Sequence, residues 1–191
     1  MLRLRDKFQL YAYYVLQSTG EVIVNDSPLS KMKENELAEY RAKEIGFIFQ
    51  FYNLIPTLTV YENVALMKDI KDDILNPITI LERVGLKNHV KKFPNQLSGG
   101  EQQRVSIARA ITKNPEILLC DEPTGALDSE TGCKVLQLIQ DVCREFQKTV
   151  IIVTHNSNIA KVADKVIRLK NGKILEISLN DSPADIKEVE W

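Results

Sequence analysis

Residues 97–104 read Leu-Ser-Gly-Gly-Glu-Gln-Gln-Arg and mark the start of a helix. Ser98 suits the N-cap position, and Glu101, three positions later, completes a capping box. An apolar stripe at helical spacing follows, formed by Val105, Ala108 and Ile111. Gly99 and Gly100 fall in the first turn, where unpaired backbone N–H groups and the helix dipole favour an anion. This stretch therefore predicts an anion site at a helix N-terminus.

A second stretch, residues 117–124, reads Ile-Leu-Leu-Cys-Asp-Glu-Pro-Thr. Its apolar run is typical of a buried strand, so Asp121 and Glu122 would lie at the carboxyl end of that strand, where ligands bind in open α/β sheets. Neighbouring residues of a strand point to opposite faces, so only one of the two is expected to face a shared site. A purely structural pair of carboxylates is the alternative interpretation.

Two more polar residues follow strand-like runs. Gln50 comes after residues 45–49, and His155 comes after residues 149–154. Each has a simpler interpretation, since a Gln at a strand end is often solvated and a solitary His is often an ordinary loop residue. Because parallel strands end at one edge of a sheet, we expect these two side chains to converge there with the carboxylates, with Ser98 displaced.

Three strings together resemble the family of ATP-binding cassette (ABC) transporter ATPases. LSGGEQQR is similar to the signature motif, ILLCDEPTGALDSETG to Walker B with the D-loop, and VTHN to the switch region. IGFIFQFYNLIPTLTVYENVAL and PNQLSGGEQQRVSIARAI resemble the branch that energises macrolide-export and lipoprotein-release permeases. The resemblance runs from about Gly20 to the C-terminus.

The resemblance implies a P-loop NTPase-like (RecA-like) α/β fold, with a mostly parallel sheet and an inserted helical lobe. Alternation of strand-like runs with helical patterns agrees with this class. We expect one ABC ATPase domain over residues 1–191, with a core lobe at 1–50 and 113–191 and a helical signature lobe at 51–112. Capped helices support that lobe, since Thr59 pairs with Glu62 and Asn76-Pro77 opens another helix, ending at Gly85.

Site roles follow from the resemblance, with ATP and Mg²⁺ as cofactors. Asp121 would hold the nucleotide's Mg²⁺, with Gln50 as a further contact, Glu122 would polarise the attacking water, and His155 would contact the γ-phosphate. The residues implied to face a nucleotide held by a partner cassette are Ser98, Gly99, Gly100, Glu101, Gln102 and Asp128. His89 lies in a lysine-rich turn and is interpreted as a surface residue.

One family motif has no counterpart in the sequence. No G-x-x-x-x-G-K-S/T phosphate loop occurs, and counting back from the strand expected at residues 21–25 places its expected position near the first residues, which read MLRLRDKF. We therefore expect an N-terminally incomplete core, whose first sixteen residues fit either a strand or a helix. This polypeptide alone is expected to bind ATP weakly and to hydrolyse it slowly or not at all.

Further elements follow from local patterns. Ser30 is expected to cap a helix through about residue 43, and another helix spans 129–146. A strand over 166–169 is expected to end the sheet, with Asn171-Gly172 turning a hairpin. The polar tail, 179–191, is expected to be a loosely docked extension.

Composition limits the possible functions. The formal net charge of −1 argues against a nucleic-acid surface, and no His, Cys, Asp and Glu cluster has the spacing of a protein metal site. The resemblance implies a cytoplasmic subunit that lies at the inner face of the membrane and forms a dimer with a second cassette. It also implies that the subunit couples ATP hydrolysis to a permease and that the transporter is an exporter. The alternative is a degenerate, non-hydrolysing cassette that donates its signature motif to an intact partner.

Overall fold

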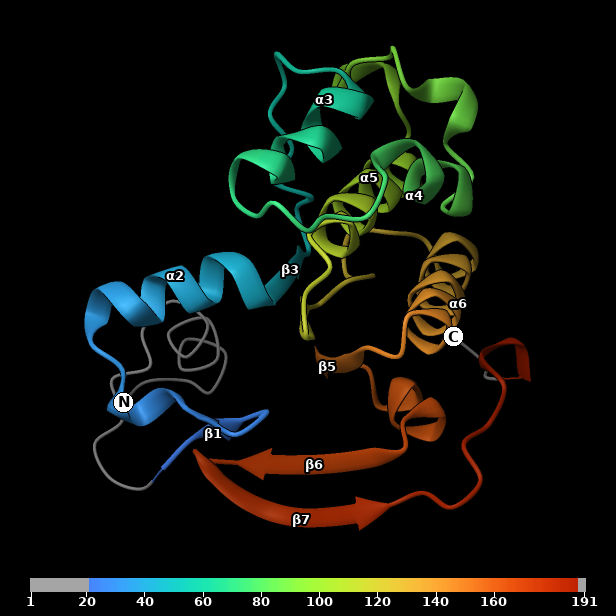
Figure 1. Ribbon diagram of the computed structural model, residues 1–191. Coiled ribbons are helices and arrows are strands. Elements are labelled where there is room, and N and C mark those ends of the chain that lie inside the picture. The colour runs from blue at the N-terminus through green and yellow to red at the C-terminus, as the bar shows by residue number, and fades with distance from the viewer. Residues whose placement is uncertain (1–20, 189–191) are drawn as a thin grey trace.

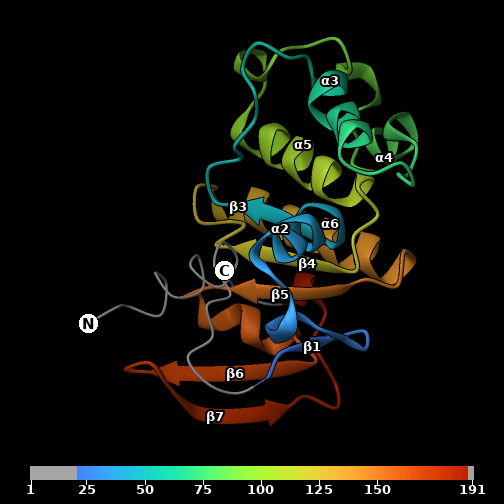
Figure 2. The same ribbon diagram turned by 60° about the vertical axis from the view of Figure 1, so that its left-hand side comes forward.

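The computed structural model describes residues 21–188. Its centre is a parallel sheet of three strands in the order β3-β4-β5 (Figures 1 and 2). The strands are β3 (Ile45–Phe49), β4 (Ile117–Asp121) and β5 (Thr149–Val153). Phe49 is in register with Asp121, and Asp121 with Val153. All three strands therefore end at the same level, and the residues that follow them share one edge of the sheet.

All the elements between residues 51 and 112 are helical. The predicted capping boxes of Thr59 and Ser98 and the predicted cap of Asn76 are all present. The elements are α3 (Val60–Ala65), η2 (Leu66–Asp69), α4 (Pro77–Arg83), η3 (Lys87–His89), η4 (Pro94–Gln96) and α5 (Gly99–Thr112). They gather at one end of the molecule (Figure 1), and their treatment as a separate lobe stays a prediction.

Helix α5 joins this helical region to the sheet. Its buried Val105 and Ile107 belong to one hydrophobic cluster with Leu81 of α4 and with Ile48 and Leu118 of the sheet. The long helix α6 (Ser129–Glu145) also packs into this cluster; it begins at Ser129 as predicted and ends within one residue of the predicted position. Because one continuous apolar core spans helices and sheet, α5 cannot shift without disturbing both.

The last strands form a ribbon apart from the parallel sheet. The strand predicted at 166–169 exists as β6 (Lys165–Lys170), but within residues 21–188 it pairs with β7 (Lys173–Leu179) in an antiparallel hairpin and not with the sheet. Asn171 and Gly172 turn this hairpin with positive φ angles of 52° and 79°. Several large apolar side chains of the ribbon are exposed, with Leu175 66% and Leu179 74% accessible.

Two N-terminal predictions need correction. The expected strand over residues 21–25 is reduced to β1 (Ile23–Val24), paired with β2 (Ser27–Pro28), because Asn25 and Asp26 turn the chain with positive φ. The helix expected to start after Ser30 is α2 (Glu34–Glu44). The Ser30 hydroxyl instead accepts the N–H of Val22 at 3.3 Å, and Leu29–Lys31 forms the short turn η1.

The tail is held more firmly than predicted. After the short turn η5 (Ser157–Val162), β6 and β7, the chain returns to α6 and ends in η6 (Ile186–Glu188). Ile186 is 2% exposed and packs with Leu136 of α6 and Ile159 of η5. The N–H of Ala184 donates to the carbonyl of Lys161 at 3.0 Å. No helix within the described 21–188 range is long and apolar enough to cross a bilayer.

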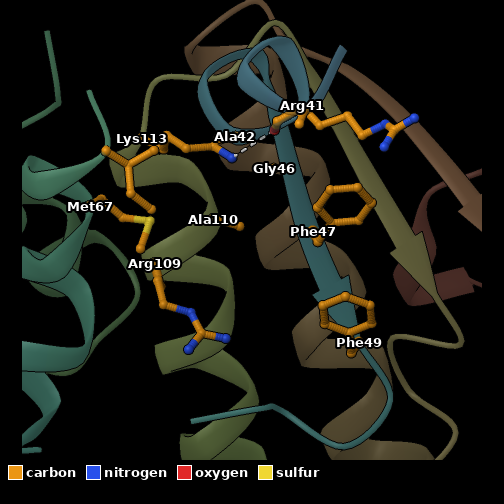
Figure 3. Close-up of a pocket in the computed structure, with 11 residues that line it drawn as sticks. Arg41, Ala42, Gly46, Phe47, Phe49, Met67, Arg109, Ala110 and Lys113 are labelled. Carbon is orange, nitrogen blue, oxygen red and sulfur yellow. Dashed lines mark hydrogen bonds between the residues drawn. The ribbon is translucent and has the colours of Figure 1, made fainter. Parts of the chain in front are cut away.

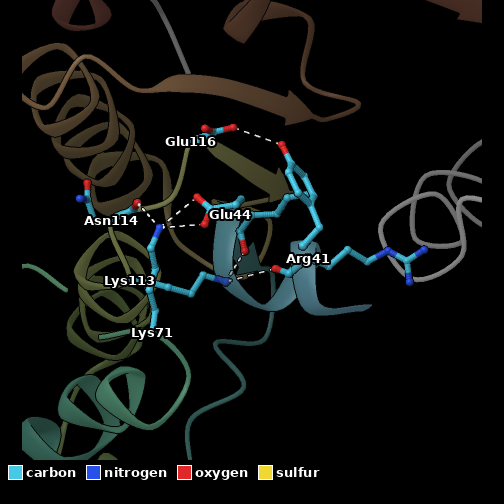
Figure 4. A network of polar contacts seen from close by, with 8 residues as sticks. Arg41, Glu44, Lys71, Lys113, Asn114 and Glu116 are labelled. Atoms are coloured by element: carbon cyan, nitrogen blue, oxygen red, sulfur yellow. Dashed lines mark hydrogen bonds and ion pairs between the residues drawn. The ribbon is translucent and has the colours of Figure 1, made fainter. Parts of the chain in front are cut away.

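A polar network joins α2, η2 and the end of α5 (Figure 4). The ammonium of Lys113 donates to the backbone carbonyls of Ile45 and Arg41, while Lys71 pairs with Glu44 at 2.9 Å. Burial, and then the charge of Lys71, lower the pKa of Lys113 to about 8. A buried ammonium held by carbonyls thus closes the joint between the helical elements and the sheet.

This pKa predicts a rise in stability at alkaline pH. The unfolded chain holds the Lys113 proton up to a pKa near 10.5, whereas the folded chain loses it near 8, so unfolding binds a proton between these values. Stability of the wild type relative to Lys113→Met should increase by up to about 3 kcal/mol as pH rises through that window. Urea unfolding at several pH values measures it, with exposed Lys173→Met as the control. A flat difference across the window would contradict the assignment.

Gly46 lets α5 approach the sheet. A Cβ there would lie 2.6 Å from Cδ2 of Leu118 and 3.0 Å from the carbonyl oxygen of Ala110. Gly46→Ala should therefore lower the free energy of unfolding by about 1–3 kcal/mol. Thr149→Ala, at an exposed strand position, should change it by less than about 0.5 kcal/mol. Equal effects of the two substitutions in urea unfolding would show that the contact is not tight.

Candidate functional site

Glu122 is the centre of the polar edge of the sheet. It follows β4 and is 9% exposed. Its two carboxylate oxygens accept the N–H of His155 at 3.0 Å and the hydroxyl of Thr154 at 3.0 Å. The carboxylate also lies 2.6 Å from Nδ1 of His155, whose side chain is 86% exposed. A buried carboxylate therefore fixes an imidazole that faces solvent, an arrangement that orients the ring for contact with a ligand.

The backbone at Glu122 holds a conformation that suits few residues. Its φ is +48°, in the left-handed region. The N–H of Glu122 continues the sheet by donating to the Val153 carbonyl at 2.9 Å, and its own carbonyl accepts the N–H of Gly125 at 3.0 Å. Such a conformation costs on the order of 1 kcal/mol and persists where surrounding bonds over-determine it, which is common at functional sites.

Gln50 reaches the same edge from β3. A Cβ on Gly125 would lie 2.8 Å from the amide nitrogen of Gln50 and 3.4 Å from Cβ of Glu122, so the Gln50 carboxamide lies across this glycine beside the carboxylate. Asp121, half-buried, is the last residue of β4. The structure therefore brings Gln50, Glu122 and His155 together next to Asp121, as the three in-register strand ends require.

The predicted anion site at α5 has the expected local geometry. Ser98 accepts the N–H of Glu101 at 3.3 Å, and Glu101 accepts the N–H and hydroxyl of Ser98 at 2.7 Å and 2.9 Å. The N–H of Ser98, above all, holds the pKa of Glu101 below its usual range. Glu101 is thus committed to the cap, and Gln102 donates to the Leu97 carbonyl at 3.2 Å. Gly99 and Gly100 form the first turn itself.

Helix α6 begins directly beside this turn. A Cβ on Gly100 would lie 2.4 Å from Cγ2 of Thr131, so the two first turns touch. Asp128 caps α6 by accepting the N–H of Thr131 at 2.9 Å, and this bond, above all, lowers the pKa of Asp128. Asp128 therefore has a structural task in the chain itself.

His89 is not the free surface residue that the lysine-rich turn predicted. Its Nε2 lies 3.2 Å from Oε1 of Glu101, and its side chain is 25% exposed. The apolar packing of the helices brings η3 against the start of α5, so His89 supports the second oxygen of the capping carboxylate. Within residues 21–188 no group of three or more His, Cys, Asp and Glu could hold a metal ion by itself.

Comparison with known proteins decides the family. A family model described as "ABC transporter" matches residues 10–125. The lipoprotein-releasing system ATP-binding protein LolD of Bacteroides fragilis is 41% identical over 162 residues, which are 82% of this chain and 75% of LolD. The chain belongs to the ABC transporter ATP-binding family.

The solved structures agree with this membership. One similar structure is the ATP-binding cassette MJ0796, solved as a dimer in a post-hydrolysis state with ADP and Pi. The match has a TM-score of 0.76 and 36% sequence identity, and it covers 92% of this chain and 81% of the MJ0796 chain. A putative ABC transporter ATP-binding protein of Mycoplasma pneumoniae, the MG065 homolog, is 44% identical over 91% of this chain. The chain spans 38% of the length of that relative.

Three residues of this ABC cassette escaped the sequence interpretation. Gln103, fully buried on α5, donates from one amide nitrogen to the carbonyls of Phe49 at 3.2 Å and Pro123 at 2.6 Å. Arg109 and Tyr52 form a second contact between α5 and the segment after β3. A buried Gln and Arg on the apolar side of a helix are the sequence signal for such contacts, because polar groups are buried only with partners.

A cavity of about 390 Å³ lies between α2, β3 and α5 (Figure 3). Its lining includes the stacked rings of Phe47 and Phe49, whose centroids are 5.8 Å apart, and the side chains of Arg109 and Lys113. None of the predicted site residues lines it. The cavity is therefore separate from the polar edge of the sheet.

Gln103 provides a test of how the edge is held. Gln103→Leu keeps the volume but leaves the Phe49 and Pro123 carbonyls without this donor, which should cost about 2–4 kcal/mol in the free energy of unfolding. Gln137→Leu on α6, whose amide meets Asp141 near the surface at 2.8 Å, is the matched control and should cost less than about 1 kcal/mol. Chemical denaturation compares the two. A cost for Gln103→Leu no larger than that of the control would refute the bridging role.

Proposed function

We propose that this cassette hydrolyses Mg²⁺-bound ATP when it is assembled as one subunit of an ABC transporter that works as an exporter, and not as an isolated polypeptide. The observation that carries the proposal is the Glu122–His155 pair, a buried carboxylate 2.6 Å from an exposed imidazole at the carboxyl edge of a parallel sheet. Hydrolysis of a phosphoanhydride needs an oriented water and stabilised charge more than it needs covalent chemistry. A fixed carboxylate beside a fixed imidazole meets the first of these needs.

The chain's own residues divide this work. Glu122 accepts hydrogen bonds through both oxygens and would accept a further one from the attacking water, while the exposed ring of His155 would contact the γ-phosphate. His155 is held by its backbone N–H as well as its ring, so its position is set before a ligand arrives. Thr154 keeps the second oxygen of Glu122 directed along the edge.

Magnesium fits the donor set of this edge. Asp121 and Gln50 offer a carboxylate and an amide, oxygen ligands that Mg²⁺ accepts beside phosphates and waters. Gln50 follows β3 and Asp121 is the last residue of β4. Because these neighbouring strands are in register, both residues lie at the same edge of the sheet. The bound ion would neutralise charge that develops on the phosphates.

Phosphate binding by this chain is proposed to act across a dimer. The first turn of α5, at Ser98, Gly99 and Gly100, directs backbone N–H groups outward and would meet a nucleotide held by the partner cassette, with Gln102 and Asp128 nearby. Glu101 would act indirectly, by keeping this turn capped. The dimeric state of MJ0796 with ADP and Pi supports this arrangement.

A permease at the inner face of the membrane is the proposed partner, with the cassette on the cytoplasmic side. The segments at residues 45–66 and 94–111 resemble the macrolide-export and lipoprotein-release branch, and the similarity to LolD points in the same direction. The similar cassette MJ0796 has been solved in a post-hydrolysis state with ADP and Pi, which favours hydrolysis over the non-hydrolysing alternative.

Glu122→Gln tests the proposal in the transporter assembled with its permease. The amide keeps the size of the side chain but accepts a proton poorly, so kcat for ATP should fall about 100-fold or more while nucleotide binding persists. Glu130→Gln, at an exposed position of α6 that pairs with Lys134, is the matched control and should leave the rate unchanged. Phosphate release in the presence of Mg²⁺ measures both. Retention of most of the activity in Glu122→Gln would overturn the assigned role.

A further inference from the structure

The segment after Gln50 has an unusual backbone. Tyr52 and Asn53 both have positive φ angles, 49° and 50°, and neither is glycine. The N–H of Asn53 donates to the carbonyl of Phe51, which tightens the turn. Two consecutive left-handed residues are energetically unfavourable for side chains other than glycine, so other contacts must hold them.

Arg109 of α5 supplies such contacts. Its Nη1 donates to the Asn53 carbonyl at 2.7 Å and its Nη2 donates to the Tyr52 carbonyl at 3.1 Å. One planar guanidinium therefore holds both strained residues at once, through two donors whose relative geometry is fixed. Figure 3 shows this side chain extending from α5 toward the end of β3.

The guanidinium is placed at some cost. Arg109 is partly buried, and this burial lowers the pKa of its guanidinium. A partly buried charge is tolerated when its hydrogen bonds are satisfied, and here they run to backbone carbonyls. Such a group is a poor choice for filling space, since an apolar side chain could line the same cavity as Phe49 and Met67 without this cost.

The same segment touches the other end of α5. A Cβ on Gly99 would lie 2.8 Å from Oη of Tyr52, so the Tyr52 side chain rests on the first turn of the signature helix. Helix α5 thus meets Tyr52 twice, through the carbonyl at Arg109 and through the ring at Gly99. The backbone conformation after Gln50 therefore depends on the position of α5.

We propose that Arg109 is a positioning residue that fixes Gln50 by clamping the left-handed pair Tyr52–Asn53 to the signature helix. The effect of Arg109 on the reaction rate rests on the proposed hydrolysis, whereas the clamp itself does not. Gln50 lies two residues before the clamped pair, and its amide packs on Gly125 beside Glu122. Loss of the clamp should let the segment relax to ordinary φ angles and move the Gln50 carboxamide away from the edge.

Hydrogen exchange of the full chain tests the clamp without any need for turnover. In Arg109→Gln, amides in residues 51–54 should exchange about ten-fold faster or more, while those of α6 stay protected. Arg109→Lys, which keeps one charged donor, should show an intermediate effect. Arg144→Gln, at an exposed position of α6, is the control. Unchanged exchange of residues 51–54 in Arg109→Gln and Arg109→Lys would overturn the clamp.

A double-mutant cycle in the assembled transporter tests the action through Gln50. Arg109→Gln alone should lower kcat for Mg²⁺-ATP about ten-fold and raise the Mg²⁺ concentration needed for half-maximal rate, with partial recovery in Arg109→Lys. In a Gln50→Ala background the same substitution should cause little further loss. Losses that simply multiply would show that Arg109 does not act through Gln50.

The two experiments separate the two proposals. If the wild-type transporter hydrolyses no ATP but Arg109→Gln still speeds exchange of residues 51–54, the proposed function is refuted and the clamp is retained. Normal hydrolysis with unchanged exchange would remove the clamp and leave the function. If Arg109→Gln fails to fold, the comparison of Arg109→Lys with Arg144→Gln still decides, since lysine preserves the charge but not the bidentate geometry.

Discussion

The in-register pairing of three short parallel strands is the constraint on which this molecule depends. Phe49, Asp121 and Val153 lie side by side, so the chain leaves the sheet three times at one level. Residues far apart in sequence become neighbours without any need for long reaching side chains. A shift of one residue in β4 or β5 would turn the polar end of that strand toward the other face and separate Glu122 from His155.

Helix α5 extends this order beyond the sheet. Its apolar side chains belong to the same core as β3 and β4, and its polar ones bind backbone carbonyls where apolar contact cannot specify position. Gln103, Arg109 and Lys113 each donate to carbonyls around β3, near its end, in the loop after it and at its start. A hydrogen bond to a backbone carbonyl does not depend on which side chain the accepting residue carries. These bonds therefore fix the helix relative to the backbone of β3 and the loop that follows it.

Local signals explain what could be predicted from the sequence. The caps at Thr59 and Ser98 and the strands around Ile48 and Leu118 depend on neighbouring residues, and a pattern of a few positions is enough to specify them. The family resemblance adds the roles of Glu122 and His155, which remain predictions even though the structure brings the two side chains together.

The features that could not be predicted depend on contacts between distant segments. Nothing near His89 in the sequence indicates that its partner is Glu101, and nothing near Ser30 indicates that its hydroxyl meets Val22. The Asn171-Gly172 hairpin is local and was predicted, but nothing in the apolar pattern of β6 indicates that, within the described residues, this strand pairs with β7 and not with the parallel sheet. Burial of Ile186 likewise arises only once α6 and η5 are in place.

The ribbon of β6 and β7 has a colloidal consequence. The ribbon exposes the apolar side chains of Ile174, Leu175 and Leu179 to water, while the chain as a whole carries a formal net charge of only −1. Electrostatic repulsion between molecules is then weak, and apolar patches attract at short range. The solubility of the purified chain should thus be set by the covering of this ribbon more than by the stability of the fold, and added salt should lower it by strengthening apolar association.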